Sequence, residues 1–244
     1  MPEFKTMKKG DFKIRWVADG NDYPGLLEDF LSGRIESKSL AHWPDRETHL
    51  VTAWGRKFLI KRCCPPPEKL KRHHWDLVSG YIFTRIMRES WAAKARGCDI
   101  IPEIYLTAEK EAGFNLCLDS YQIAEFLEGE TLSGWHEKDF KNVPTDWMLD
   151  LRDAVLKLHK YGLASGSIHP WNLVRTRAGV KVIDLSIKGP TLISQGHDIL
   201  DLKRRCNLDA APANLAIKVM SRLVFMKYWW HCWRRDFKAR RKSR

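Results

Sequence analysis

The chain has 244 residues, of which 44% are apolar and 30% charged, and its net charge is +12. This length can bury a substantial core, as one domain or as two lobes that share a cleft. The composition is typical of a folded protein and excludes a disordered one. No run of about 18 apolar residues and no apolar block of a secretory signal occurs, so we expect neither a spanning helix nor export. The six cysteines lack C-x-x-C spacing, which favours reduced thiols in a cytoplasmic protein.

The first half of the chain predicts a β-rich layer with one main helix. Residues 48–61 predict a hairpin with a turn at Gly55-Arg56 and a second strand that ends at Lys61. The following "CCPPPEK" ends that strand. Apolar residues at helical spacing predict a helix from about Trp75 to Arg96, and Gly97 supplies its stop. Strand character resumes in "IIPEIYLTAE" and "NLCLDSYQIAEFLEG".

The second half is mainly helical. A helix is expected to begin near Pro144-Thr145 and to stop at Gly162. Two short strands follow at 173–174 and 180–183, joined by "RTRAG", and helical patterns occupy the rest. Strands with one helix, followed by helices, predict an α+β protein of two lobes.

Five positions along these predicted elements, taken in chain order, are candidates for functional residues. They are a strand-closing lysine, a helix glutamate, an acidic-apolar strand end before a glycine, a loop asparagine and a strand-end aspartate: Lys61, Glu89, Glu125–Leu127, Asn172 and Asp184. Each alone is weak evidence, because such residues are usually solvated or belong to turns. The ordered set, with the spacing between "HPWN" and "IDLS", carries the weight.

In this order the sequence resembles the protein-kinase-like superfamily and, within it, the small bacterial heptose kinases of the lipopolysaccharide core (the WaaY/RfaY type). The resemblance covers about residues 48–205 and is strongest in "KFLIKR", "EFLEGETL", "SGSIHPWNLV" with "VKVIDLS", and "HDILDLKRR". It implies a protein-kinase-like α+β fold. The small β-rich N-lobe (1–128) would bind nucleotide, and the mostly helical C-lobe (129–233) would carry the catalytic loop and the metal site. A basic tail (234–244) would follow.

The resemblance also implies ATP and Mg²⁺ as cofactors. Lys61 would hold the α- and β-phosphates, and Glu89 would fix the lysine side chain. The backbone from Glu125 to Leu127 would hold adenine. Asn172 and Asp184 would offer the oxygen ligands that Mg²⁺ prefers.

Two motifs of regulated protein kinases are absent from the sequence. The segment before the hairpin, "SLAHWPDRE", has no glycine, so no G-x-G-x-x-G loop would cover the phosphates. No A-P-E follows "IDLS", which favours a small-molecule or glycan acceptor over a protein acceptor. His197 and Asp198 before "ILDL" predict a helix cap, and the alternative is that Asp198 braces the catalytic loop.

The catalytic loop departs most from the family pattern. Aligned on Pro170 and Asn172, the general-base aspartate position holds Ser167. A serine hydroxyl cannot usefully take up a proton at neutral pH, and general-base catalysis is typically worth about 10²–10⁴ in rate. Three accounts stay open: a slow kinase in which His169 or Asp201 orients the acceptor, a nucleotide-binding pseudokinase, and an enzyme inactivated by substitution.

The C-terminus combines aromatic and basic residues. "LVFMKYWWHCW" precedes a run in which Asp236 is the only acid among Arg234, Arg235, Lys238, Arg240, Arg241, Lys242 and Arg244. This pattern suits the interface of an anionic membrane. The alternatives are a nucleic-acid surface, and a helix over 223–233 that packs its aromatic face on the core.

The predicted reaction is transfer of the γ-phosphoryl group of ATP to a heptose of the lipopolysaccharide inner core. The acceptor would be a glycolipid at the cytoplasmic face of the inner membrane of a Gram-negative bacterium, where the protein would bind peripherally. One alternative is a pseudokinase scaffold in core assembly, and another is an antibiotic- or choline-type small-molecule kinase. No nucleic-acid partner is expected, because the basic residues form no recognisable reading motif.

Overall fold

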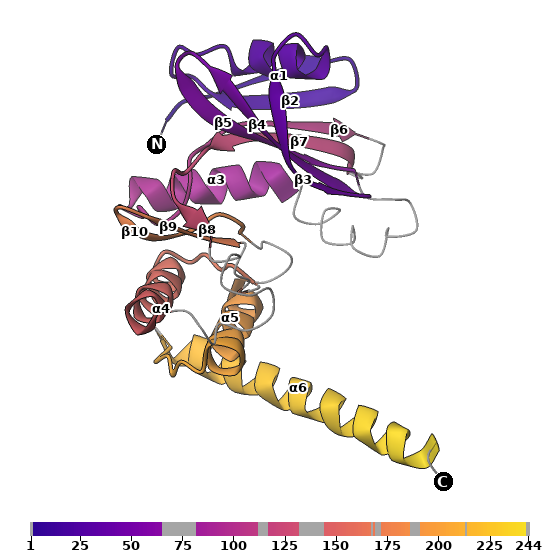
Figure 1. Ribbon diagram of the computed structural model, residues 1–244, viewed down its shortest axis with the longest axis vertical. Coiled ribbons are helices and arrows are strands. Elements are labelled where there is room, and N and C mark those ends of the chain that lie inside the picture. The colour runs from indigo at the N-terminus through magenta and orange to yellow at the C-terminus, as the bar shows by residue number, and fades with distance from the viewer. Residues whose placement is uncertain are drawn as a thin grey trace. The chain divides into compact units, whose positions relative to one another are not determined.

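The structure is a computed structural model, and the chain divides into two compact units, Met1–Glu128 and Gly129–Arg244. The described residues are 2–64, 82–111, 117–131, 144–166, 168, 172–185, 191–212 and 214–242. Strands dominate the first unit and helices the second (Figure 1). The α+β class predicted from the sequence is therefore confirmed.

Unit 1 is built on a seven-stranded antiparallel sheet in the order β1-β2-β6-β7-β5-β4-β3. Its strands are β1 (Phe4–Lys9), β2 (Phe12–Val17), β3 (Ser37–Trp43), β4 (Arg46–Ala53), β5 (Arg56–Cys63), β6 (Ile104–Glu111) and β7 (Cys117–Glu125). The hairpin predicted for residues 48–61 is β4–β5, and the glycine-free segment "SLAHWPDRE" forms most of β3 and the turn into β4.

The turn of the β4–β5 hairpin was predicted one residue too late. Trp54 and Gly55 are its central residues, with φ angles of 51° and 70°, and Arg56 already belongs to β5. Two positive φ values in succession are typical of the two-residue type I′ turn, whose twist matches that of the flanking strands.

The two faces of the sheet differ in chemistry. One face is apolar and packs Phe58, Ile60 and Ile123 against α1 (Tyr23–Leu31). The other face carries polar side chains and is covered by α3 (Ile82–Ala95), as Figure 1 shows. This alternation follows from the two-residue period of a strand. The sheet therefore has its core on the α1 side and a polar surface beneath α3.

The main helix of unit 1 ends where the sequence predicted. α3 stops at Ala95, and Gly97 takes a left-handed φ of 92° while its N–H donates to the Lys94 carbonyl oxygen at 2.8 Å. Glycine adopts this conformation without strain, which explains the stop. The N-terminal part of the predicted helix, before residue 82, lies outside the described residues.

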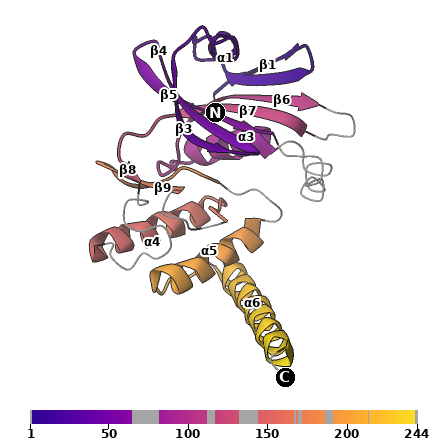
Figure 2. The ribbon, with the colours of Figure 1, turned by 45° about the vertical axis from the view of Figure 1, so that its right-hand side comes forward.

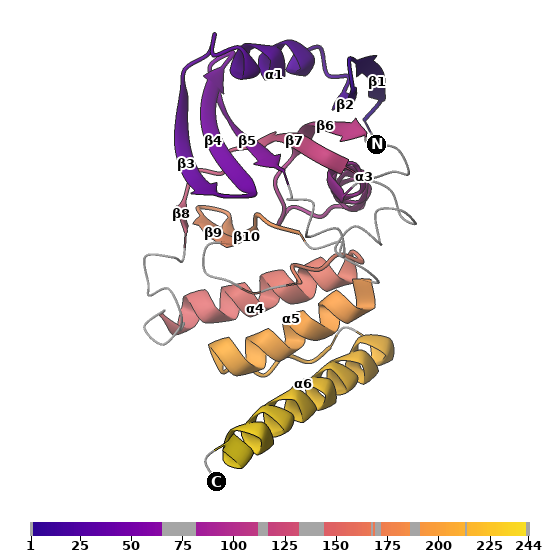
Figure 3. The ribbon, with the colours of Figure 1, turned by 90° about the vertical axis from the view of Figure 1, so that its right-hand side faces the viewer.

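Unit 2 combines a small sheet with three helices. The sheet has the order β10-β9-β8, and Figure 3 shows the helices side by side. The elements of unit 2 are β8 (Glu130–Thr131), α4 (Thr145–Lys160), β9 (Leu173–Thr176), β10 (Gly179–Val182), α5 (Thr191–Cys206) and α6 (Leu215–Lys242). The predicted helix before Gly162 and the two predicted strands are thus confirmed. Within the described part of the chain, no helix is both long enough and apolar enough to span a bilayer.

Candidate functional site

Lys61 projects from the polar face of the unit 1 sheet. In β5 it lies opposite Thr48 of β4 and Gln122 of β7, and Gln122 in turn lies opposite Thr107 of β6. Directly opposed residues share a face, so Lys61 points to the side that α3 covers. Lys61 is half-buried, and because β5 pairs with a strand on each side, the backbone that carries this side chain is held in place.

Glu89, the predicted partner of Lys61, lies on α3. Its carboxylate is 3.3 Å from Nη2 of the neighbouring Arg88, and its side chain is 45% exposed. A pair this exposed contributes little to stability. The contact between Glu89 and Lys61 stays a prediction.

A buried carboxylate that sequence reasoning missed anchors α3. Glu109 of β6 is fully buried and accepts hydrogen bonds from the backbone N–H and the hydroxyl of Thr84 in α3. Nη1 of Arg15 donates to the Thr84 hydroxyl at 2.8 Å and lies 3.9 Å from the carboxylate. Glu109 alternates with apolar residues along β6, a pattern that normally indicates a solvent-facing position. Its burial follows from contacts with other elements, among them α3.

The strand end predicted to bind adenine is partly engaged within unit 1. The Glu125 N–H donates to the Glu103 carbonyl oxygen at 2.8 Å, and its carboxylate accepts from the Glu103 N–H at 3.0 Å. Lys57 pairs with Glu128 at 3.0 Å, and Leu127 between these contacts is half-buried. The Glu125 N–H already has an acceptor, and the adenine contact of the backbone from Glu125 to Leu127 stays a prediction.

In unit 2, the β9–β10 hairpin brings the two predicted metal ligands together. Leu173 lies opposite Val182, and the pairing continues one step further, because the Ile183 N–H donates to the Asn172 carbonyl oxygen at 2.9 Å. Asp184 is the next residue and is exposed. Asn172 and Asp184 therefore lie at the same end of one hairpin.

This donor set fits Mg²⁺. An amide oxygen and a carboxylate oxygen are hard ligands, and Mg²⁺ in phosphotransferases usually takes one or two protein oxygens and completes its shell with water and phosphate. Among the described residues, no group of three or more His, Cys, Asp or Glu side chains could hold a metal ion by itself. Asn172 and Asp184 thus suit a magnesium ion that arrives with a nucleotide.

The helix cap predicted at Asp198 is wrong. It does not cap a helix but lies in the middle of α5, with a fully buried side chain. Its Oδ2 accepts a hydrogen bond from the Ser165 N–H at 2.9 Å and lies 3.0 Å from Nε2 of His159 in α4. Burial raises the pKa of the Asp198 carboxyl group, and the hydrogen bonds with His159 and Ser165 oppose that rise. These contacts agree with the alternative prediction from the sequence, in which Asp198 braces the catalytic loop.

A second carboxylate of α5 holds the same loop. Asp201 accepts from the Ile168 N–H at 3.3 Å through Oδ2, and its Oδ1 lies 3.3 Å from Nε of Arg205. Each oxygen of Asp201 thus has a partner within unit 2, and the orientation of an acceptor by His169 or Asp201 stays a prediction. Ser167 and His169 themselves lie outside the described residues.

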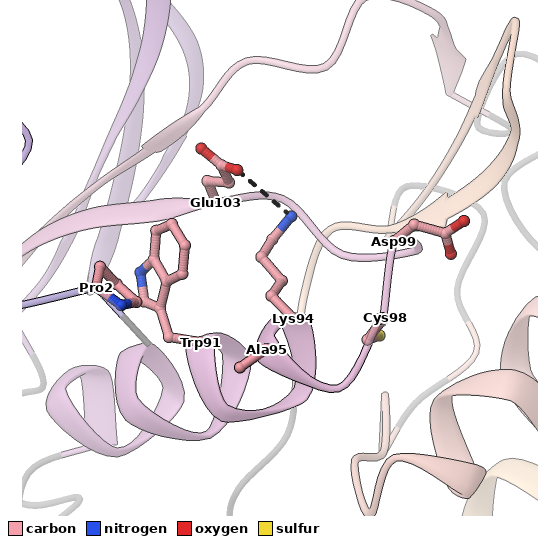
Figure 4. A pocket seen from close by; sticks show the side chains of 8 residues that line it. Pro2, Trp91, Lys94, Ala95, Cys98, Asp99 and Glu103 are labelled. Carbon is pink, nitrogen blue, oxygen red and sulfur yellow. Dashed lines mark ion pairs between the residues drawn. The ribbon is translucent and has the colours of Figure 1, made fainter.

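An open depression of about 540 Å³ lies at the C-terminal end of α3 (Figure 4). Its rim includes the Lys94–Glu103 ion pair at 3.9 Å, and Trp91 donates to the Ile104 carbonyl oxygen at 2.7 Å. None of the predicted site residues lines it. The depression therefore does not belong to the candidate site.

The fold and the site together define an α+β protein with a strand lysine in a β-rich unit and an Asn-Asp pair beside a braced loop in a helical unit. The sequence profile of the family described as "Lipopolysaccharide core biosynthesis protein (WaaY)" matches residues 4–222. The chain therefore belongs to this family.

Two curated relatives have the name "Lipopolysaccharide core heptose(II) kinase WaaY". The relative from Escherichia coli is 24% identical over 199 residues, which are 81% of this chain and 84% of the relative. The relative from Escherichia coli strain K12 is 24% identical over 195 residues, which are 80% and 82% of the two chains. The solved BubR1 kinase domain has a TM-score of 0.41 at 15% identity and covers 74% of this chain and 48% of its own.

Proposed function

We propose that this protein is an ATP-dependent phosphotransferase that phosphorylates a heptose of the lipopolysaccharide inner core. The observation that carries the proposal is the position of Asn172 and Asp184 at one hairpin end, in a chain whose family includes proteins named heptose(II) kinases. The braced loop from Ser165 to Ile168 supports it, because it precedes this hairpin in the chain.

In phosphoryl transfer the protein mainly positions groups and balances charge, because the transition state is loose. Lys61 would neutralise the α- and β-phosphates. Asn172 and Asp184 would hold Mg²⁺, which supplies positive charge to the transferring phosphoryl group when bound. Asp198 accepts a hydrogen bond from the Ser165 N–H, and Asp201 accepts one from the Ile168 N–H.

The second candidate function is a nucleotide-binding pseudokinase that serves as a scaffold in core assembly. Ser167 at the general-base position favours it, since the hydroxyl cannot accept the proton of the attacking alcohol. On the enzymatic account, His169 or the acceptor's own placement compensates, and transfer is slow.

The test is mass spectrometry of core oligosaccharide from cells that lack this protein and are complemented with variants. Lys61→Ala and Asp184→Ala are expected to remove the heptose phosphate. The matched controls are Lys57→Ala, in the same strand and paired with Glu128, and Asp209→Ala, an exposed residue paired with Lys203. Phosphate that persists in Lys61→Ala and Asp184→Ala cells would support the scaffold and refute the enzyme.

A second complementation separates an impaired enzyme from a fully active one. Ser167→Asp restores the general base, and phosphate that increases only with this variant would show that the wild-type sequence is slow. Equal phosphate in both would show that Ser167 does not limit the reaction.

The acceptor we propose is a glycolipid of the inner membrane, reached by a peripheral protein whose basic C-terminus meets anionic headgroups. Deleting residues 234–244 is expected to weaken binding to anionic vesicles, most strongly at low salt. Unchanged vesicle binding would refute a role for this segment.

A further inference from the structure

α6 has two opposed apolar faces, and one of them is occupied by α5. Ile217 and Val224 are buried. A side chain added at Gly196 of α5 would lie 3.1 Å from Cγ of Met220, so the two helices approach closely there. The guanidinium of Arg204 lies 3.7 Å from the ring centroid of Tyr228. This face therefore holds α6 on unit 2.

The other face carries apolar side chains that are exposed. Six of them, between 46% and 74% exposed, recur at intervals of three or four residues: Leu215, Val219, Leu223, Met226, Trp230 and Trp233. At about 100° per residue these positions form one continuous stripe on the side opposite Ile217 and Val224. We call it the exposed stripe. The rings of Trp230 and Trp233 stack within it, 5.1 Å apart.

The exposed stripe is long and accessible. α6 has 28 residues and α5 has 16, which correspond to about 42 Å and 24 Å of helix. Figure 2 shows α6 running past the end of α5. Single exposed apolar residues are normal on soluble proteins, but a continuous apolar surface of this kind marks an interaction site.

The charged residues beside the exposed stripe indicate which kind of partner can bind it. Lys218 and Arg222 flank it on one side and Lys227 on the other, and no acidic residue occurs between Leu215 and Arg235. An anionic partner suits these flanks. A second copy of α6 would place basic residues against basic residues, which disfavours a symmetric dimer.

We propose that α6 is an interfacial membrane helix that lies along the surface of an anionic bilayer. The exposed stripe enters the boundary between headgroups and acyl chains, the flanking lysines and arginine meet lipid phosphates, and the opposite face keeps its contact with α5. Tryptophan suits this depth because its ring is apolar and its N–H is polar. The inference rests on the proposed function for its setting, a membrane that holds the glycolipid acceptor. It adds apolar insertion to the electrostatic contact of residues 234–244.

The test is co-sedimentation of the full chain with vesicles of phosphatidylcholine and phosphatidylglycerol, at low and at high salt. The stripe variant is Leu223→Ser with Met226→Ser, and the matched control is Leu149→Ser, an exposed leucine of α4. We expect the stripe variant to bind about tenfold or more weakly at both salt concentrations. We expect Arg222→Gln to bind about fivefold more weakly at low salt only. Stripe-variant binding equal to that of the wild type would overturn the proposal.

Three controls make the result specific. An independent Trp233→Ser variant guards against a folding defect in the double variant, and equal thermal midpoints identify folded proteins. A wild-type dimer in solution that is lost in the stripe variant would overturn the proposal in favour of self-association.

Phosphoryl transfer to water-soluble core oligosaccharide is expected to be the same in the wild type and the stripe variant. Absence of this transfer in the wild type would refute the proposed function, whereas the vesicle result would stand.

Discussion

Replacing Asp198 by alanine tests the brace that connects α4, α5 and the loop before Ser167. The substitution removes the acceptor of the Ser165 N–H and the oxygen that lies 3.0 Å from Nε2 of His159. Both side chains of the His159–Asp198 pair are fully buried, so water cannot replace the lost partner without opening the structure. The loop should lose both stability and position.

The magnitude follows from these two contacts. Removing one partner of a buried, hydrogen-bonded pair costs about 3–5 kcal/mol, and one buried N–H without an acceptor accounts for about 1–3 kcal/mol of such a loss. We therefore expect Asp198→Ala to lower the free energy of unfolding of unit 2 by about 3–5 kcal/mol. Asp198→Asn keeps an oxygen that can accept from Ser165, so its cost should be about 1–2 kcal/mol.

The assay is urea denaturation of the wild type, Asp198→Ala, Asp198→Asn and His159→Ala, with kcat and KM for ATP measured on the folded proteins. A positioning role predicts a lower kcat with a nearly unchanged KM in Asp198→Ala, and partial rescue in Asp198→Asn. A double-mutant cycle with His159→Ala should give a clear coupling energy, because the two side chains are in contact. Asp198→Ala with wild-type stability and wild-type kcat would refute the brace.

Three further substitutions probe unit 1 and the start of unit 2. Glu109→Ala should destabilise unit 1 by about 2–3 kcal/mol, because Thr84 loses its acceptor; the measurement is urea denaturation, and a change within error would contradict the proposed anchor of α3. Gly129→Ala would bring a side chain against the Arg175 carbonyl oxygen, so a cost of about 1–3 kcal/mol is expected in thermal denaturation, and a neutral effect would show that β8 can shift. Burial raises the pKa of Tyr121 to about 12 from 10.0, so its contribution to stability is complete below pH 10 and is lost as the pH rises toward about 12. Tyr121→Phe should therefore flatten the alkaline loss of stability by up to about 1.4 kcal/mol per pH unit, and an unchanged slope would contradict a buried neutral phenol.

The sequence predicted the elements around the site well because their signals are local. A β-rich run with a glycine turn predicted the β4–β5 hairpin, a glycine predicted the end of α3, and helical spacing predicted α4. The sequence placed Asn172 in the loop before one strand and Asp184 at the end of the next, and the hairpin register brings these two positions together.

Contacts between distant segments could not be predicted in this way. The buried surroundings of Asp198 come from His159, which is 39 residues away, so "HDILDL" alone favoured a helix cap. Glu109 has the alternating pattern of an exposed residue, and its burial depends on tertiary contacts such as those with α3. For the aromatic segment 223–233, the sequence left three interpretations open: core packing, membrane contact and a nucleic-acid surface. The structure shows that one helix face is buried on α5 and the other is exposed.

We propose that Lys61 and Asp184 both serve the transfer of a phosphoryl group from ATP. The most direct test is a double-mutant cycle on kcat/KM for phosphoryl transfer from ATP to dephosphorylated core oligosaccharide, with Lys61→Ala, Asp184→Ala and the double variant. Groups that act as a unit are strongly non-additive. We expect each single variant to lose nearly all activity and the double variant to be little worse. Additive effects, or a single variant with wild-type kcat/KM, would contradict it.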